Sequence, residues 1–178
     1  MNPILLSATE FCHLVDIEVK RFEQRRIRER AKLDLGDVSM EDPDFVAMPV
    51  VPTEPGKHGR FDAIDVIRLR SVIILERGGM SFNEGCKFIR QSGTTGYLGH
   101  IGPEDYLAAR WIELNGDIRH VSGNAYVLAR AMPAIPLFAT KLNITAVADQ
   151  VAERAAALPK PLGIRHGHFI ALEGANDR

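Results

Sequence analysis

Basic side chains gather in two stretches of the sequence, and their chemistry is that of phosphate and base recognition. Between residues 19 and 32, seven Lys or Arg side chains stand against two Glu side chains. The second stretch surrounds a Gly59-Arg60 turn. An arginine can donate two hydrogen bonds to guanine O6 and N7, and either basic residue can neutralise a backbone phosphate. The candidate DNA-binding residues are Lys20, Arg21, Arg25, Arg26, Lys57, His58 and Arg60.

An acidic stretch separates the two basic ones. Residues 33–56 contain six Asp or Glu and no Lys or Arg, and their four prolines exclude a long helix. We interpret this stretch as a solvated connector. The alternatives are an elongated wing and an acidic segment that competes with DNA for the basic helix. The basic helix has an alternative role too, a solvated face with intrahelical pairs such as Arg25 with Glu29.

Other residue types offer less chemistry. His166 and His168 alternate as they would on one face of a strand, but Glu173 is their only acidic or thiol neighbour. We therefore predict no metal site. The glycine-bearing stretch 96–102 lacks the lysine of a phosphate-binding loop. Since no nucleophile stands beside a base either, we expect no enzyme and no cofactor.

Composition is that of a globular protein. The chain has 178 residues, 46% of them hydrophobic and 25% charged, with a net charge of −1, so general disorder is excluded. Two cysteines, Cys12 and Cys86, imply no disulfide framework and are expected to be core residues. The sequence shows no signal peptide and no membrane-spanning apolar run, so we expect a cytoplasmic protein.

Capping residues mark the helices of the first half. Ser7 and Glu10 form a capping box for a helix to Val15, and residues 16–18 break it before a second helix from 19 to 31. Phe22 is the core anchor of that second helix. Further on, Asp62 caps a helix that ends at Gly78-Gly79, and Ser81 to Glu84 form a capping box for the next one. Residues 93–102 are the predicted linker between domains 1–92 and 103–178.

The second half predicts a small α/β region. Pro103 is expected to start a helix whose stripe of Leu107, Trp111 and Leu114 ends at Asn115-Gly116. Helix packing is the favoured role for Trp111 and Tyr106, with a small-molecule pocket as the alternative. Residues 117–128 read as a hairpin turning at 122–124, although 126–132 fit a helix equally well. A helix from Asn143 to Leu158 and a strand over 166–173 complete the prediction.

Two segments carry a family resemblance. Residues 59–73, GRFDAIDVIRLRSVI, and 79–84, GMSFNE, resemble the wing and following helices of the MerR-type winged helix-turn-helix proteins. Phe61 stands where that family often has tyrosine. Less closely, residues 7–15 are similar to the family's first helix and residues 19–26, VKRFEQRR, to its recognition helix.

The resemblance implies an α+β, mostly helical fold: an N-terminal winged helix-turn-helix with a small C-terminal α/β region. It implies a transcriptional regulator that binds double-stranded DNA, with the second helix in the major groove and the wing on the backbone or minor groove. A homodimer is expected. Because the family's long dimer helix is missing, its interface is expected on the small-residue stripe of helix 143–158. A core-facing helix explains that stripe equally well. Residues 103–178 would serve dimerisation, a protein partner or a small-molecule effector. A protein-interaction module and an architectural or excision-type DNA-binding factor are the alternatives.

Overall fold

The structure is a computed structural model that describes residues 4–34, 61–92, 104–133, 136 and 138–172, with side chains along the first range up to Arg28. Its class is α+β, as predicted. The predicted linker, the wing residues and nearly all of the acidic connector lie outside the described residues. The helices are α1 (Ala8–Val15), α2 (Val19–Asp34), α3 (Ala63–Arg77), α4 (Phe82–Gln91), α6 (Ala125–Ala131) and α7 (Ile144–Ala156). The strands are β1 (Leu107–Ile112), β2 (Ile118–Gly123), β3 (Phe138–Asn143), β4 (Leu162–Arg165) and β5 (His168–Ala171).

Helices α1, α3 and α4 begin where their capping residues predicted. Ser7 and Glu10 form the capping box of α1, and Asp62 and Asp65 form another at the start of α3. At α4 the Ser81 side chain accepts from the Glu84 backbone N–H, as expected. The Glu84 carboxylate, however, accepts from the Ser81 hydroxyl rather than from the Ser81 backbone. These local hydrogen bonds satisfy donors that a helix start leaves open, which is why the sequence alone located the helices.

Three phenylalanines join the N-terminal helices. Phe11 of α1 stacks on Phe61 at 4.2 Å between ring centroids, and Phe22 of α2 meets Phe61 edge-on at 5.7 Å. All three side chains are buried. Backbone hydrogen bonds between Leu6 and Phe61 fix the segment before α3 beside the segment before α1. Phe22 is thus a core anchor, as predicted, and it holds α2 to α1 and α3.

The predicted helix over residues 103–114 is wrong, because Leu107–Ile112 form strand β1. β1 is the central strand of an antiparallel sheet ordered β2–β1–β3. Both of its faces are covered, so its apolar residues show no strict alternation and their spacing imitated a helical stripe. The Asn115-Gly116 pair, expected to end a helix, instead turns the chain from β1 into β2, with Gly116 at φ +89°.

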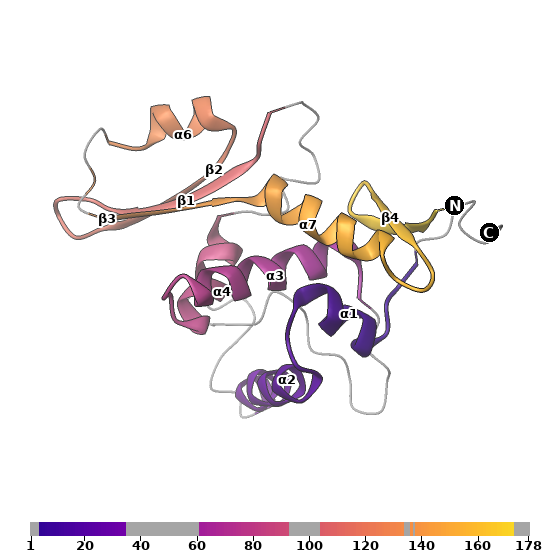
Figure 1. The fold of residues 1–178 in the computed structure, drawn as a ribbon. Coiled ribbons are helices and arrows are strands. Elements are labelled where there is room, and N and C mark those ends of the chain that lie inside the picture. The colour runs from indigo at the N-terminus through magenta and orange to yellow at the C-terminus, as the bar shows by residue number, and fades with distance from the viewer. Residues whose placement is uncertain (1–3, 35–60, 93–103, 134–135, 137, 173–178) are drawn as a thin grey trace.

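The following segment corrects one further expectation and supports the alternative to it. The hairpin turns at residues 115–116 rather than at 122–124, and β2 runs up to Gly123. The alternative helix over 126–132 is close to α6, which Asn124 caps. Strands β3 and β4 were not predicted. In Figure 1, α6 lies on one side of the sheet, and α3 and α4 lie on the other.

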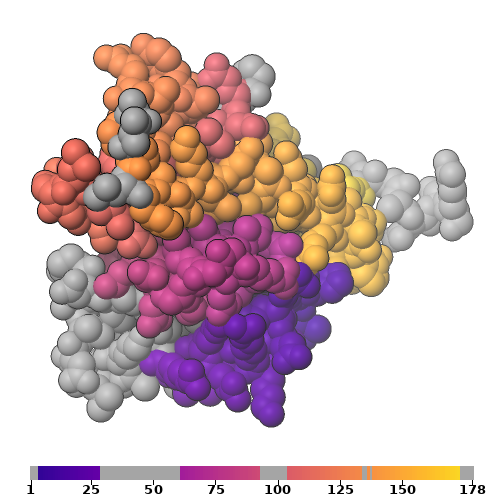
Figure 2. Space-filling view, turned by 60° about the vertical axis from the view of Figure 1, so that its left-hand side comes forward, coloured from indigo at the N-terminus to yellow at the C-terminus, as the bar shows by residue number. Residues whose placement is uncertain are grey.

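The C-terminal elements pack on the N-terminal helices. One cluster of buried side chains runs from Leu6 through α1, α3 and α7 to Phe169 of β5. Figure 2 shows α3 and α4, in magenta, between the indigo N-terminal helices and the orange C-terminal segments. The small-residue stripe of α7 is buried in this core, with Val151 and Ala155 fully covered. A dimer interface on that stripe is therefore wrong, and its alternative as a core-facing surface is confirmed.

No described helix has the length and apolar character needed to cross a membrane.

Candidate nucleic-acid interface

One face of α2 is turned to solvent, and it is basic and amide-bearing. Lys20, Gln24, Ile27 and Arg28 are exposed: Gln24 follows Lys20 by four residues, and Ile27 and Arg28 follow Gln24 by three and four. Opposite them, Phe22 is fully buried in the aromatic core. In Figure 1, α2 lies at the edge of the molecule, below α1. A helix with one anchored side and one free polar side is what insertion into a DNA groove needs.

A single carboxylate on α3 holds α2 through two arginines. Glu76 Oε1 accepts from Arg21 Nη2 at 2.9 Å and from Arg25 Nη2 at 2.6 Å. The Arg25 side chain is only 13% exposed, whereas that of Arg21 is 52% exposed. These two candidate DNA-binding arginines therefore differ in their surroundings, because the Arg21 side chain is half exposed whereas Nη1 of Arg25 is buried.

Arg25 is also fixed by an aromatic ring. Its guanidinium carbon lies 3.7 Å from the centroid of the Phe82 ring on α4, at a distance typical of a cation–π contact. With Glu76 on α3 and Phe82 on α4, Arg25 joins α2 to two other helices. The sequence made Arg25 a candidate for a base or phosphate contact, whereas the structure places its largely buried side chain against α3 and α4 instead of on the exposed face of α2.

The remaining predicted residues fall into three groups. Arg26 pairs with Glu23 on its own helix at 2.7 Å, and its side chain is 23% exposed. Lys20 is exposed on the free face of α2. The predicted wing residues Lys57, His58 and Arg60 lie outside the described residues, as does the side chain of Glu29.

Two residues of the exposed face were missed by the sequence prediction. Gln24 and Arg28 follow Lys20 at intervals of four residues, so all three share one helical face. Glutamine can bond adenine N6 and N7 in a bidentate way, and arginine can do the same with guanine. The burial of Phe22 would have pointed to them, because it fixes which face of the helix turns outward.

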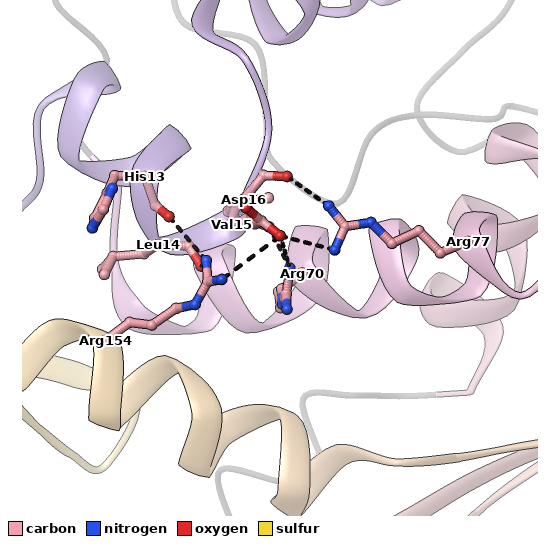
Figure 3. A network of polar contacts seen from close by, with 7 residues as sticks. All are labelled: His13, Leu14, Val15, Asp16, Arg70, Arg77 and Arg154. Atoms are coloured by element: carbon pink, nitrogen blue, oxygen red, sulfur yellow. Dashed lines mark hydrogen bonds and ion pairs between the residues drawn. The ribbon is translucent and has the colours of Figure 1, made fainter.

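The turn between α1 and α2 is locked by three arginines on one aspartate. Asp16 adopts the left-handed conformation, with φ 67° and ψ 51°, a region that aspartate tolerates better than most residues. As Figure 3 shows, its carboxylate meets Arg77 at 2.8 Å, Arg70 at 3.1 Å and Arg154 at 3.6 Å. The arginines come from α3 and α7, so two helices that pack behind the turn set its geometry.

The same arginines also hold backbone carbonyls at the end of α1. Arg70 donates to the Val15 carbonyl at 3.2 Å, and Arg154 donates to the His13 and Leu14 carbonyls. α1 ends here, so its last carbonyls need donor partners beyond the helix; the His13 carbonyl also accepts from the Asp16 backbone N–H at 3.3 Å. Hydrogen bonds from Arg77 and Arg70, and the charge of Arg154, hold the pKa of the Asp16 carboxyl below its usual value. Asp16 therefore stays ionised at neutral pH, and the angle at which α2 leaves α1 is fixed electrostatically.

The two histidines considered as metal ligands do not share one strand face in the structure. His166 lies in the turn between β4 and β5, whereas His168 is the first residue of β5. The His168 ring contacts the Asp62 carboxylate at the start of α3. Within the described ranges, no three His, Cys, Asp or Glu side chains come together as a metal site would require.

No family model matches the sequence, and no curated protein matches it.

Proposed function

We propose that the chain is a DNA-binding transcriptional regulator of the MerR type, in which α1, the Asp16 turn and α2 form a helix-turn-helix. α2 enters the major groove with its exposed face, and the basic residues 57–60 form the wing. The protein performs no catalysis in this proposal. The observation that carries it is the free Lys20–Gln24–Arg28 face on a helix anchored from behind by Phe22 and Glu76.

In this proposal, different side chains of this face contact different parts of the DNA. Lys20 stands in the first turn of α2, where it can reach a backbone phosphate. Gln24 and Arg28 can contact base edges, and the 65% exposed Ile27 between them can pack on a thymine methyl group. Arg21 retains enough exposure for a phosphate contact while its other nitrogen stays on Glu76.

Two copies binding a two-fold site is the arrangement we propose, because one such helix covers only a few base pairs. The α7 stripe is not the contact between them, since it is buried within the chain.

The test measures binding of the chain to duplex DNA of random sequence, with fluorescence anisotropy as the readout, over a series of salt concentrations. Binding should weaken steeply with salt, and the Lys20→Ala variant should lower the slope of log K against log salt by about one. Arg28→Ala should weaken binding to a selected site by about 10- to 100-fold, as expected for the loss of one bidentate base contact. Gln24→Ala should relax the preference for adenine at one position.

Arg119→Ala is the matched control, because Arg119 is a half-exposed arginine on β2 that pairs with Glu113 and Asp117. It removes the same charge away from α2 and should leave the affinity unchanged. Binding that has no salt dependence, or that Lys20→Ala and Arg28→Ala leave as it was, would reject the DNA-binding proposal. The α2 surface would then be assigned to a protein partner.

A further inference from the structure

A cavity lies between the α3–α4 turn and the sheet. Its volume is about 700 Å³, within the range of small-molecule sites. The α3 and α4 side contributes Ile74, Leu75 and Met80, and the sheet side contributes Ile112, Phe138 and Leu142. These walls are apolar, and the 57% exposed Phe138 stands at the rim. The cavity therefore suits a molecule with an apolar body.

In the described part of the chain, two cations line this space, Arg110 on β1 and Lys141 on β3. Only Arg110 has its side chain on the sheet face that the cavity covers, because Lys141 alternates with Thr140 and Leu142. Arg110 lies at the centre of β1, and the strand pairing puts it on the same face as Thr140 and Ile112, which also line the cavity. Its side chain is only 16% exposed. Among the described residues, its guanidinium donates no hydrogen bond, and its nearest carboxylate is Glu84 at 3.8 Å. A guanidinium that hydrogen-bonds no described acceptor keeps its donors available to a ligand in the cavity.

We propose that this cavity binds a small carboxylate with an apolar body, and that Arg110 receives the carboxylate in a bidentate contact. The planar fork of arginine matches the two oxygens of a carboxylate. Glu84 occupies the vicinity of the guanidinium without hydrogen-bonding it, so it competes weakly with the ligand. The apolar walls take up the rest of the molecule.

The position of the cavity gives the ligand a means of regulation, a step that rests on the proposed DNA-binding function. The last turn of α3 faces the cavity with Ile74 and Leu75, and it holds α2 with Glu76. The next residue, Arg77, holds the Asp16 turn. A ligand that favours one position of this turn must change DNA affinity, and DNA must change ligand affinity by the same factor.

Calorimetry of the whole chain with decanoate and with 2-naphthoate, up to about 1 mM, tests the site without DNA. We expect saturable binding of one molecule per chain for at least one of the two acids. Decanol and 2-naphthalenemethanol supply the same apolar bodies without the charge and should bind at least 10-fold more weakly. No saturable binding of either acid, or equal binding of the alcohols, overturns the proposal.

Three variants locate the site. Arg110→Gln should weaken acid binding by about 10- to 100-fold, the loss expected for a charge-assisted contact, whereas Arg119→Gln on the neighbouring strand should not change it. Glu84→Gln removes the competing carboxylate and should tighten binding. Phe138→Ala shortens the rim and should weaken binding of both acids without unfolding the chain. Unchanged affinity in Arg110→Gln, with circular dichroism showing it folded, or weaker binding in Glu84→Gln, would overturn the assignment.

The DNA measurement is then made with and without the acid that binds. A change in DNA affinity matched by the reciprocal change in acid affinity supports regulation, and no change rejects it. If the chain binds no DNA at all, the proposed function fails while the calorimetric result on the cavity stands.

Discussion

Arg154 of α7 lies 3.6 Å from the carboxylate of Asp16, the residue that turns the chain from α1 into α2. The C-terminal helix thus contacts the turn that presents the candidate recognition helix. Arg154 also donates to two carbonyls at the end of α1. The C-terminal part of the chain therefore contributes to the geometry of the proposed helix-turn-helix.

Replacing Arg154 tests this contact. Arg154→Gln should lower the free energy of unfolding by about 1 kcal/mol, because it removes two hydrogen bonds and one partly exposed ion pair. Urea unfolding followed by circular dichroism measures the loss. Arg165→Gln, an exposed arginine at the end of β4, is the control and should change little. Equal stability of the two variants would contradict a role for Arg154 in the turn.

Asp16 predicts a pH dependence. Its pKa is lowered in the folded protein, so its ionised form stabilises the fold at pH values above the unfolded pKa of about 4. That contribution is lost as the pH falls through the lower folded pKa. Asp16→Asn keeps a residue that tolerates positive φ but removes the charge. The stability difference between wild type and Asp16→Asn should be constant above about pH 5 and should shrink in acid.

Asp16→Gly separates charge from backbone strain. Glycine adopts positive φ without cost, so this variant should lose the ion pairs but keep the turn. Asp16→Ala should be the least stable of the three, since it loses the ion pairs and strains the backbone. Urea unfolding at several pH values gives the order, and a stability of Asp16→Ala equal to wild type would refute the account of this turn.

Arg25 and Arg28 should separate stability from DNA binding. Arg25→Ala removes a largely buried side chain that contacts Glu76 and Phe82, so it should lower stability by roughly 1–3 kcal/mol. Arg28→Ala changes an exposed side chain and should leave stability within about 0.5 kcal/mol while weakening DNA binding. Thermal unfolding and anisotropy on both variants check the pair. The reverse pattern would mean that α2 is oriented otherwise.

The Cys12 thiol should be unreactive in the folded protein. Burial raises its pKa to about 11, with a smaller contribution from the charge of Glu23. At pH 8 the thiol therefore stays protonated, and the thiolate is the reactive form. Ellman's reagent should label Cys12 and the equally buried Cys86 only after denaturant is added. Rapid labelling of the native protein would show that α1 opens readily.

The N-terminal helices were predictable because their signals are local. Ser7 with Glu10 and Asp62 with Asp65 each complete a capping box within four residues. Strand β5 lies within the strand predicted over 166–173, but β1 was not predictable, because it gains its pairing from β2 and from a strand about thirty residues further on. With both faces of β1 covered, the alternation that identifies a strand disappears.

The sequence predicted the helix of the candidate interface, but not which of its side chains face the solvent. A run of arginines shows that α2 is basic, yet the partners of Arg25 lie on α3 and α4, far along the chain. Gln24 was not among the predicted DNA-binding residues because it carries no charge. Phe22, already expected in the core, and the contact of Arg25 with Glu76 together decide which residues face outward, and the second of these depends on distant residues.

The packing of α7 and β5 onto α1 and α3 has a consequence for synthesis of the protein. Ribosomes add about 5–20 residues per second, so on the order of ten seconds separate the emergence of α4 from that of Phe169. Throughout that interval the apolar sides of α1 and α3 that α7 and β5 later bury remain exposed to solvent. The nascent chain is then most exposed to aggregation, and a chaperone that holds it would raise the yield of native protein.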